Sequence, residues 1–185
     1  MPRSAGTAPD RGRLLRLLLA GALLLAAATA PAAGFSDSEF DDEQKPWSEI
    51  EAQLPAWPKD ENLLRFEAGP VTSNRFYIDA PSLSVGADGV IRYTMVVRAA
   101  GGANNVFFEG IRCETREQKL YAVGRNDGRW TRARDPAWRF IEYKDLNRHH
   151  GVLFADFFCE VSRKGKPLPA KDILAALKRE NVRMR

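Results

Sequence analysis

The chain has 185 residues and a formal net charge of +4, from 28 lysines and arginines against 24 aspartates and glutamates. The first 32 residues hold four of the arginines and one aspartate, so the remainder carries 24 basic and 23 acidic side chains. A general nucleic-acid binder needs a strong positive field, which this remainder lacks. Its length suits one domain with a substantial core.

The beginning of the chain has the order of a secretory signal peptide. Basic residues come first, an apolar run from Leu17 to Ala28 follows, and small residues stand at Ala30 and Ala32. That order is typical of a cleaved export signal, and the run of about a dozen residues is too short to span a membrane, which takes roughly twenty. We predict a signal peptide at residues 1–32, cleaved before Ala33. The basic residues are Arg3, Arg11, Arg13 and Arg16.

The segment after the predicted cleavage site is acidic and sparsely apolar. No cysteine lies near that site to carry a lipid, so we expect a soluble periplasmic protein without a lipid anchor or a transmembrane segment. Residues 33–45 are predicted to be a mobile, solvated leader, and residues 46–185 a single domain. The acidic residues of the leader are Asp37, Glu39, Asp41, Asp42 and Glu43.

The chain contains two cysteines, Cys113 and Cys159. An even number of cysteines in an exported protein favours a disulfide bond, and here only one pairing exists. A redox pair or a zinc site fits less well, because there is no Cys-x-x-Cys motif and no His/Cys set at zinc spacing.

Most of the domain has the pattern of antiparallel strands. Phe76 and Ile78 alternate with polar residues, and residues 85–90 carry an Asp-Gly turn between apolar flanks. Residues 90–98 give the clearest strand, with Ile91, Tyr93, Met95 and Val97 on one face. Further strands are expected at 106–113, 119–123 and 129–134. The connections are too short for crossover helices, so we predict a β-meander.

Three helices are expected around this sheet. Pro46 and the spacing of Trp47, Ile50 and Leu54 predict a short helix that the following prolines end. Residues 142–158 favour a helix, although a buried strand running into Cys159 fits as well. Pro169 is predicted to begin the last helix, with Ile173, Leu174 and Leu177 as its apolar stripe. The fold class is therefore α+β, with a meander flanked by short helices.

Several segments together resemble the cryptic neisserial protein-like family of exported proteobacterial proteins. The resemblance covers nearly all of the mature chain and implies a Gram-negative envelope location. It implies no activity, substrate or catalytic residue, because the family is uncharacterised. The segments are Trp47–Leu63, Val85–Tyr93, Phe108–Thr115, Asn147–His150 and Phe157–Cys159.

The pair His149-His150 is the first candidate for chemistry, because imidazoles near carboxylates bind metals or transfer protons. Neighbouring residues on a helix point about 100° apart, however, and the i, i+4 spacing of zinc helices is absent. We expect one histidine to be a hydrogen-bonded partner where the sheet meets the helix, and we predict no metal, no cofactor and no catalytic residue.

Basic and aromatic residues interleave between residues 125 and 139. Five arginines face two aspartates there, and two tryptophans offer stacking surfaces. This pattern indicates a site for an anionic envelope component such as a glycan or lipopolysaccharide, while a solvated edge strand with tryptophan anchors is the alternative. The candidate ligand-binding residues are Arg125, Arg129, Trp130, Arg132, Arg134 and Trp138.

A third segment, Glu109–Arg116, places Cys113 beside Arg112 and between acidic side chains. A basic neighbour lowers the pKa of a thiol, but the expected disulfide leaves no nucleophile, so cross-strand ion pairs are the preferred interpretation. The sequence thus predicts an exported periplasmic or envelope protein acting as a non-catalytic binding or accessory module. The alternative is a periplasmic hydrolase that uses His149 or His150.

Overall fold

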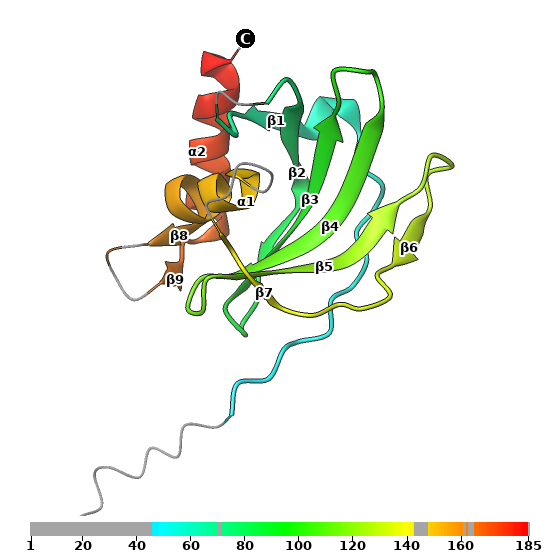
Figure 1. The fold of residues 1–185 in the computed structure, drawn as a ribbon. Coiled ribbons are helices and arrows are strands. Elements are labelled where there is room, and N and C mark those ends of the chain that lie inside the picture. Colours follow the sequence, from blue (N-terminus) through cyan, green and yellow to red (C-terminus); the bar gives the residue numbers. More distant parts are fainter. Residues whose placement is uncertain (1–45, 70–71, 143–147, 161, 163–164, 185) are drawn as a thin grey trace, which may run out of the picture. The chain divides into compact units, whose positions relative to one another are not determined.

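A computed structural model describes residues 46–69, 72–142, 148–160, 162 and 165–184. The predicted signal peptide and acidic leader lie outside these residues. Residues Lys45–Arg185 form one compact unit. Its main feature is an antiparallel sheet in which the strands follow one another in chain order from β1 to β6, with β7 also paired to β5 (Figure 1). The α+β fold with a β-meander is therefore confirmed.

The sheet contains β1 (Leu63–Phe66), β2 (Arg75–Val85), β3 (Val90–Arg98), β4 (Asn104–Arg112), β5 (Glu117–Gly124), β6 (Trp130–Arg132) and β7 (Arg139–Phe140). A 3-10 turn, η1 (Asp60–Asn62), precedes it. The helical elements are α1 (Arg148–Val152), the π-helical segment η3 (Leu153–Phe158) and α2 (Ala170–Arg183), with a small ribbon of β8 (Cys159–Glu160) and β9 (Lys166–Pro167) between them.

The predicted hairpin between residues 85 and 90 is present, with Gly86 N–H bonded to Val90 O at 2.9 Å. Strand β3 is buried on both faces of the sheet. One face, which we call the inner face, carries Ile91, Tyr93, Met95 and Val97, as the alternation predicted, and it forms the main core. The opposite, outer face carries Phe108, Tyr121 and Ala122, which form a second, smaller core.

The helices cover the inner face, because their apolar side chains are part of its core. Leu153, Phe154 and Phe158 come from η3, and Ile173 and Leu177 from α2. Figure 1 shows α1 and α2 on one side of the sheet, with β8 and β9 below them. The sequence therefore predicted α2 correctly. It also favoured a helix over a buried strand for residues 142–158. Residues 148–158 are helical and Glu142 is not, while residues 143–147 lie outside the described part.

The prediction of a helix at residues 46–54 is wrong. Residues 46–59, which we call the strap, have no regular secondary structure and lie across the outer face, where Ala52 joins the second core. The apolar spacing has another cause. Trp47 lies under the Arg112 guanidinium at 3.9 Å, while Ile50 and Leu54 are exposed.

A glycine in β5 lets the strap approach the sheet closely. A Cβ atom built on Gly124 would lie 2.7 Å from the Trp57 ring and 2.8 Å from Val106 Cβ, so no larger residue fits without displacing one of them. Trp57 in turn stacks at a tilt against Trp130, with ring centroids 5.4 Å apart. The strap and strand β6 therefore share one aromatic contact.

Cys113 and Cys159 are bonded to each other, with their Cα atoms 5.6 Å apart. Both cysteines of the chain are thereby used. The bond joins the end of β4 to β8, so it ties the sheet to the segment that leads into α2. The predicted disulfide is confirmed. No helix among the described residues is both long and apolar enough to cross a bilayer.

Candidate functional site

A cavity of about 620 Å³ lies on the inner face of the sheet, beside α1. Its volume is in the range of about 300–1,000 Å³ that is usual for sites holding small organic ligands. Strands β2 to β5 supply apolar walls, and α1, β4, β5 and β7 supply polar groups. The apolar wall residues are Phe76, Met95, Val97, Phe107 and Leu120. The polar residues that line it include Glu109, Gln118, Arg139, Arg148, His149 and His150.

A β-bulge shapes the wall formed by β4 and β5. Phe108 pairs with Ala122, but Glu109 pairs with Leu120, so Tyr121 is the extra residue. Because of this bulge, Tyr121 and Ala122 both pack on the outer face, while Leu120 and Glu109 both line the cavity. Bulges often redirect a side chain beside a functional site in this way.

Glu109 and His150 form a buried pair at the base of the cavity. Nε2 of His150 lies 2.9 Å from Oε2 of Glu109, which also accepts a hydrogen bond from Tyr93 Oη at 3.0 Å. Burial alone raises the pKa of the Glu109 carboxyl, but the charges and hydrogen bonds of His150, His149 and Tyr93 outweigh it and lower that pKa. A histidine at the junction of sheet and helix therefore has the hydrogen-bonded role that the sequence suggested.

His149 is in a different situation. Its ring stacks on Phe76 with centroids 5.1 Å apart and lies 4.1 Å from the His150 ring. Burial, and to a smaller extent His150, lowers its pKa to about 4, so the imidazole is neutral at physiological pH. Within the described residues it has ring contacts but no hydrogen-bond partner. It therefore presents one N–H donor and one nitrogen acceptor on the wall of the cavity.

Arg148 begins α1 and lies against Gly69, whose φ of +107° belongs to the left-handed region. A Cβ atom at that position would meet Arg148 Cδ at 3.0 Å. The glycine thus supplies both the backbone conformation and the room for the arginine at the cavity.

Gln118 and Arg139 are cross-strand partners on β5 and β7, so their side chains lie side by side at the opposite end of the cavity from Phe76. Oε1 of Gln118 is buried and has no hydrogen-bond partner among the described residues. Arg139 is 66% exposed, and within the described part of the chain it pairs with Asp135 at 4.0 Å, itself 85% exposed. This end of the cavity therefore has a guanidinium and an amide that are only weakly engaged.

The part of the chain that the structure describes contains no cluster of side chains suited to binding a metal ion. No three histidine, cysteine, aspartate or glutamate side chains there are arranged to hold an ion. Among the described residues that line the cavity, the only hydroxyl is that of Thr72, whose Oγ1 accepts the Asn74 N–H at 3.1 Å. The cavity thus supplies groups for binding and for proton transfer, without an activated serine or cysteine.

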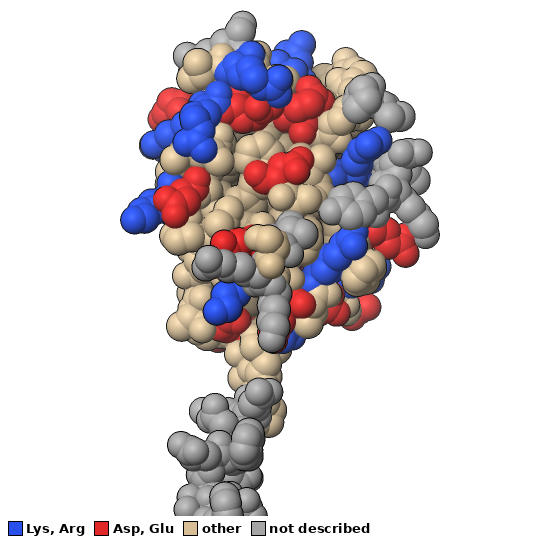
Figure 2. Space-filling model, turned by 90° about the vertical axis from the view of Figure 1, so that its left-hand side faces the viewer, with Lys and Arg blue, Asp and Glu red and all other residues tan. Residues whose placement is uncertain are grey.

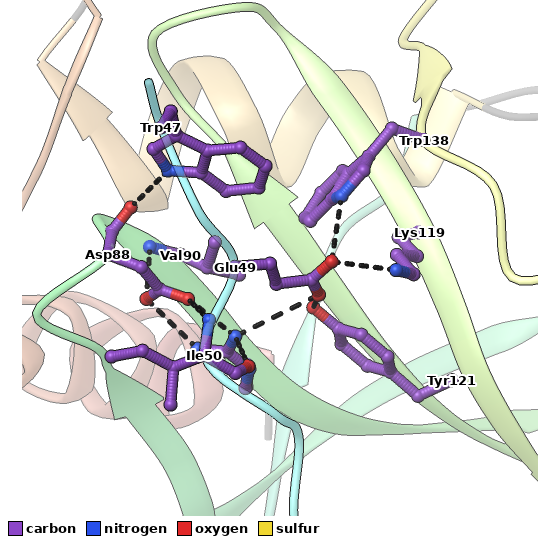
Figure 3. A network of polar contacts seen from close by, with 9 residues as sticks. Trp47, Glu49, Ile50, Asp88, Val90, Lys119, Tyr121 and Trp138 are labelled. Carbon is purple, nitrogen blue, oxygen red and sulfur yellow. Dashed lines mark hydrogen bonds and ion pairs between the residues drawn. The ribbon is translucent and has the colours of Figure 1, made fainter. Parts of the chain in front are cut away.

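A second polar network fastens the strap to the outer face (Figure 3). The Glu49 carboxylate accepts hydrogen bonds from Lys119 Nζ at 2.7 Å, Tyr121 Oη at 2.8 Å and Trp138 Nε1 at 3.1 Å. The burial of Glu49 opposes its ionisation, but these donors prevail and lower its pKa. We call this network, together with that around Asp88, the clamp.

Asp88 is the other half of the clamp. Its carboxylate accepts the Ile50 N–H at 2.9 Å and pairs with Arg92, whose Nη2 lies 2.7 Å away, while its backbone oxygen accepts the Trp47 indole N–H. The Asp88 side chain is 1% exposed and that of Arg92 9% exposed. Asp88 thus holds Trp47 and Ile50 of the strap, and Glu49 of the strap is held by donors on the sheet side, in one largely buried, charge-assisted network.

The clamp changes how the predicted arginine–tryptophan site is understood. Trp138 donates to Glu49, and Trp130 donates its indole N–H to Pro55 O at 3.0 Å, so both indoles are anchored to the strap side of the molecule. Arg129 pairs with Asp127 at 2.6 Å. Arg125, Arg132 and Arg134 are exposed. The prediction of an anionic ligand at residues 125–139 stays a prediction.

The residues of Glu109–Arg116 are also arranged differently from the expected cross-strand ion pairs. Arg112 pairs with Glu114, two residues along the same stretch, at 2.8 Å, and Glu109 pairs with His150. Sequence reasoning therefore missed Glu109 as a partner of the histidines, and it missed Gln118 and Arg139 as cavity residues. Their alternation along the strands indicates which face of the sheet they lie on, but it does not indicate which of these side chains border a cavity.

The face of the molecule that carries α2 has mixed charge. Figure 2 shows basic and acidic side chains interspersed on it. A polyanion-binding surface has a clear excess of one sign, which this face lacks.

The fold and this site define a class: an α+β domain with a curved antiparallel sheet, a ligand-sized cavity on one face and a chain segment clamped to the other. The chain belongs to the CNP1-like family, whose model matches residues 42–178. No curated protein matches the chain, and no solved structure does.

Proposed function

We propose that this protein is an exported binding module of the Gram-negative envelope and that its cavity holds a small organic ligand. The observation that carries the proposal is the cavity of about 620 Å³ with apolar walls. On its surface lies the neutral imidazole of His149, which has no hydrogen bond to the other described residues. A few polar groups among apolar walls are the usual composition of a ligand site. Glu109 and His150 satisfy each other and form the rigid base.

Several observations support export. The order of residues 1–32 is that of a signal peptide. The bond between Cys113 and Cys159 is of the kind that persists in oxidising compartments. The proposal also takes the CNP1-like family to be the same as the exported neisserial family that the sequence resembles. Amino-terminal sequencing of protein from a periplasmic extract should begin at or near Ala33, whereas a soluble protein that retains Met1 would contradict it.

Filling the cavity tests the binding function. The anionic dye 1-anilinonaphthalene-8-sulfonate should become fluorescent with the wild-type protein, and Leu120→Trp should abolish the signal by occupying the cavity. Val182→Trp is the control, because Val182 on α2 is 69% exposed and does not line the cavity. A wild-type protein without dye binding, or equal binding by Leu120→Trp, would contradict the proposal.

One observation favours a hydrolase as the second candidate. The adjacent His149 and His150 lie in a cavity with Glu109, and histidine–carboxylate sets of this kind activate water by removing its proton. His149, with a pKa near 4, is a weak base, so we rank this function below binding. A panel of nitrophenyl esters tests it: hydrolysis that His149→Ala abolishes would make catalysis the leading function.

A further inference from the structure

We infer that the cavity binds the carboxyl-terminal end of a short, mainly apolar peptide. This inference rests on the proposed binding function and specifies the chemistry of its ligand. The inference rests on the polar groups at the two ends of the cavity, which are Gln118 with Arg139 at one end and His149 at the other.

The Gln118 and Arg139 end fits a carboxylate. The two residues are direct cross-strand partners and both line the cavity, so a guanidinium and a primary amide extend from neighbouring positions at this end. Arginine binds carboxylates through paired N–H donors, and a glutamine amide adds a further N–H. Asp135 lies 4.0 Å from Arg139 and is 85% exposed, so a ligand carboxylate displaces only a loose surface pair. The Gln118 amide turns readily about its last torsion, so its Oε1, which has no partner among the described residues, can also accept a hydrogen bond from the ligand.

The His149 end requires a group that both donates and accepts hydrogen bonds. Its imidazole is neutral, largely buried and stacked on Phe76, and it has ring contacts but no hydrogen bond within the described residues. A ligand that covered it with hydrocarbon would leave an N–H and a nitrogen unpaired in a dry wall, which is unfavourable. A peptide group offers a carbonyl oxygen and an N–H and meets both needs.

The distance between the two ends sets the length of the ligand. His149 stacks on β2 and neighbours His150, which bonds to β4, so it lies over β3. Strands are about 4.8 Å apart, so β5 lies about 10 Å from β3 across the sheet. Along the strands, Gln118 is level with Ile91, whereas Phe76 is level with Val97 and Glu109 with Tyr93, which adds an offset of roughly 7–20 Å between His149 and Gln118. At about 3.3 Å per residue, an extended peptide of roughly four to six residues joins the two ends. Between the ends, Met95, Phe107 and Leu120 line the path, which favours apolar side chains.

Three probes separate the contributions by calorimetric titration of the purified protein. They are acetyl-leucyl-alanyl-leucyl-alanyl-leucine with a free carboxylate, the same peptide as its carboxyl-terminal amide, and decanoate. The acid peptide should bind at least tenfold more tightly than the amide, which lacks the charge, and at least tenfold more tightly than decanoate, which lacks peptide groups.

Two variants assign the ends. Arg139→Gln should weaken the acid peptide about tenfold and leave the amide unchanged. His149→Phe, which keeps the stacking on Phe76, should weaken both peptides by the same factor. The control is Lys178→Gln on the exposed side of α2, which should change neither. Cooperative thermal unfolding of each variant checks that it is folded.

The outcomes distinguish this inference from the proposed function. If decanoate binds as tightly as the acid peptide, or displaces the anilinonaphthalene dye when the peptides do not, the cavity is a binding site and the peptide inference is wrong. If the peptides bind but Arg139→Gln has no effect on the acid, the assigned end is wrong and the inference fails. If neither the dye nor any of the three probes binds, the proposed function falls with it.

Discussion

Nε2 of His150 and Oε2 of Glu109 lie 2.9 Å apart, although 41 residues separate them, and their side chains are only 9% and 6% exposed. The pair joins α1 to β4 within an otherwise apolar region. A buried pair of this kind adds little over well-packed apolar side chains, but removing one partner leaves the other desolvated without compensation.

Replacing Glu109 with alanine is therefore expected to reduce the free energy of unfolding by about 3–5 kcal/mol, since His150 and the Tyr93 hydroxyl both lose their acceptor. Urea denaturation measures it. The matched control is Glu114→Ala, which removes a 71% exposed carboxylate paired to Arg112 and should cost less than about 1 kcal/mol. Equal losses in the two variants would mean that the buried pair has no special role.

The stability of the protein should fall as the pH is lowered from about 6.5 to about 4, and His149 is the reason. Its pKa is 6.5 in the unfolded chain and about 4 in the folded one, so the unfolded state binds the proton first. The full contribution is present above pH 6.5 and amounts to roughly 3 kcal/mol lost by pH 4. Glu109, whose pKa is also lowered, acts in the same direction below its ordinary value of 4.5. Thermal melts across this range should be flatter for His149→Phe; an unchanged slope would exclude His149 as the cause.

Breaking the clamp at Asp88 should release the strap. Asp88→Ala removes the acceptor for Ile50 N–H and leaves Arg92 buried with only the more distant Glu49, at 3.9 Å, as an ionic partner. We expect a loss of about 3–5 kcal/mol and faster amide exchange for residues 47–57. Asp60→Ala, which removes an 85% exposed carboxylate from Arg98, should change the stability by less than about 1 kcal/mol. Exchange that stays slow in Asp88→Ala would show that apolar contacts alone hold the strap.

The disulfide closes a loop with a sequence separation of 46 residues. The loop-entropy relation gives about 4 kcal/mol for a loop of this size. The double variant Cys113→Ala, Cys159→Ala should therefore unfold at a markedly lower urea concentration, with a steeper dependence on urea, because the unlinked unfolded chain exposes more surface. Reduction of the wild-type protein by dithiothreitol should have the same effect, while the double variant should not respond to it.

The exposed arginines of residues 125–139 should bind polyanions weakly and in a salt-dependent manner. Reversing Arg129, Arg132 and Arg134 to glutamate should abolish retention on immobilised lipopolysaccharide or polyphosphate at low salt, and physiological salt should reduce it, because exposed charges are screened beyond about 8 Å. The control reverses Lys171, Lys178 and Arg179 on α2. Retention that survives the first set would leave these arginines as a solvated face.

The parts of the fold that local pattern determines could be predicted from the sequence. Strand β3 alternates, the turn at 86–89 has Asp-Gly, and α2 begins after Pro169 with a clear apolar stripe. The disulfide followed from counting cysteines. The strap was wrongly predicted as a helix because Trp47 and Glu49 are placed by partners 41 to 89 residues away, which no local spacing reveals.

The candidate site was visible only in part for the same reason. The histidine pair stood out by composition, but its carboxylate is on β4, and Glu109 looked like one of several alternating charges. The cavity itself is an unfilled space between side chains of several strands and α1. Nothing in the order of residues marks it, because it depends on a bulge at Tyr121 and on how far η3 and α2 cover the sheet.

The clamp also has a temporal consequence. The strap precedes every strand of the sheet, yet Glu49 is held by Lys119, Tyr121 and Trp138, which lie 70 to 89 residues further along. At roughly 5–20 residues per second of synthesis, the strap waits several seconds for the donors that receive it. During that interval Trp47, Trp57 and the Glu49 carboxylate have no sheet to lie on. The first described segment of the chain to be made is thus among the last to be fastened, and any chaperone that protects the nascent protein has an extended, tryptophan-bearing segment to hold.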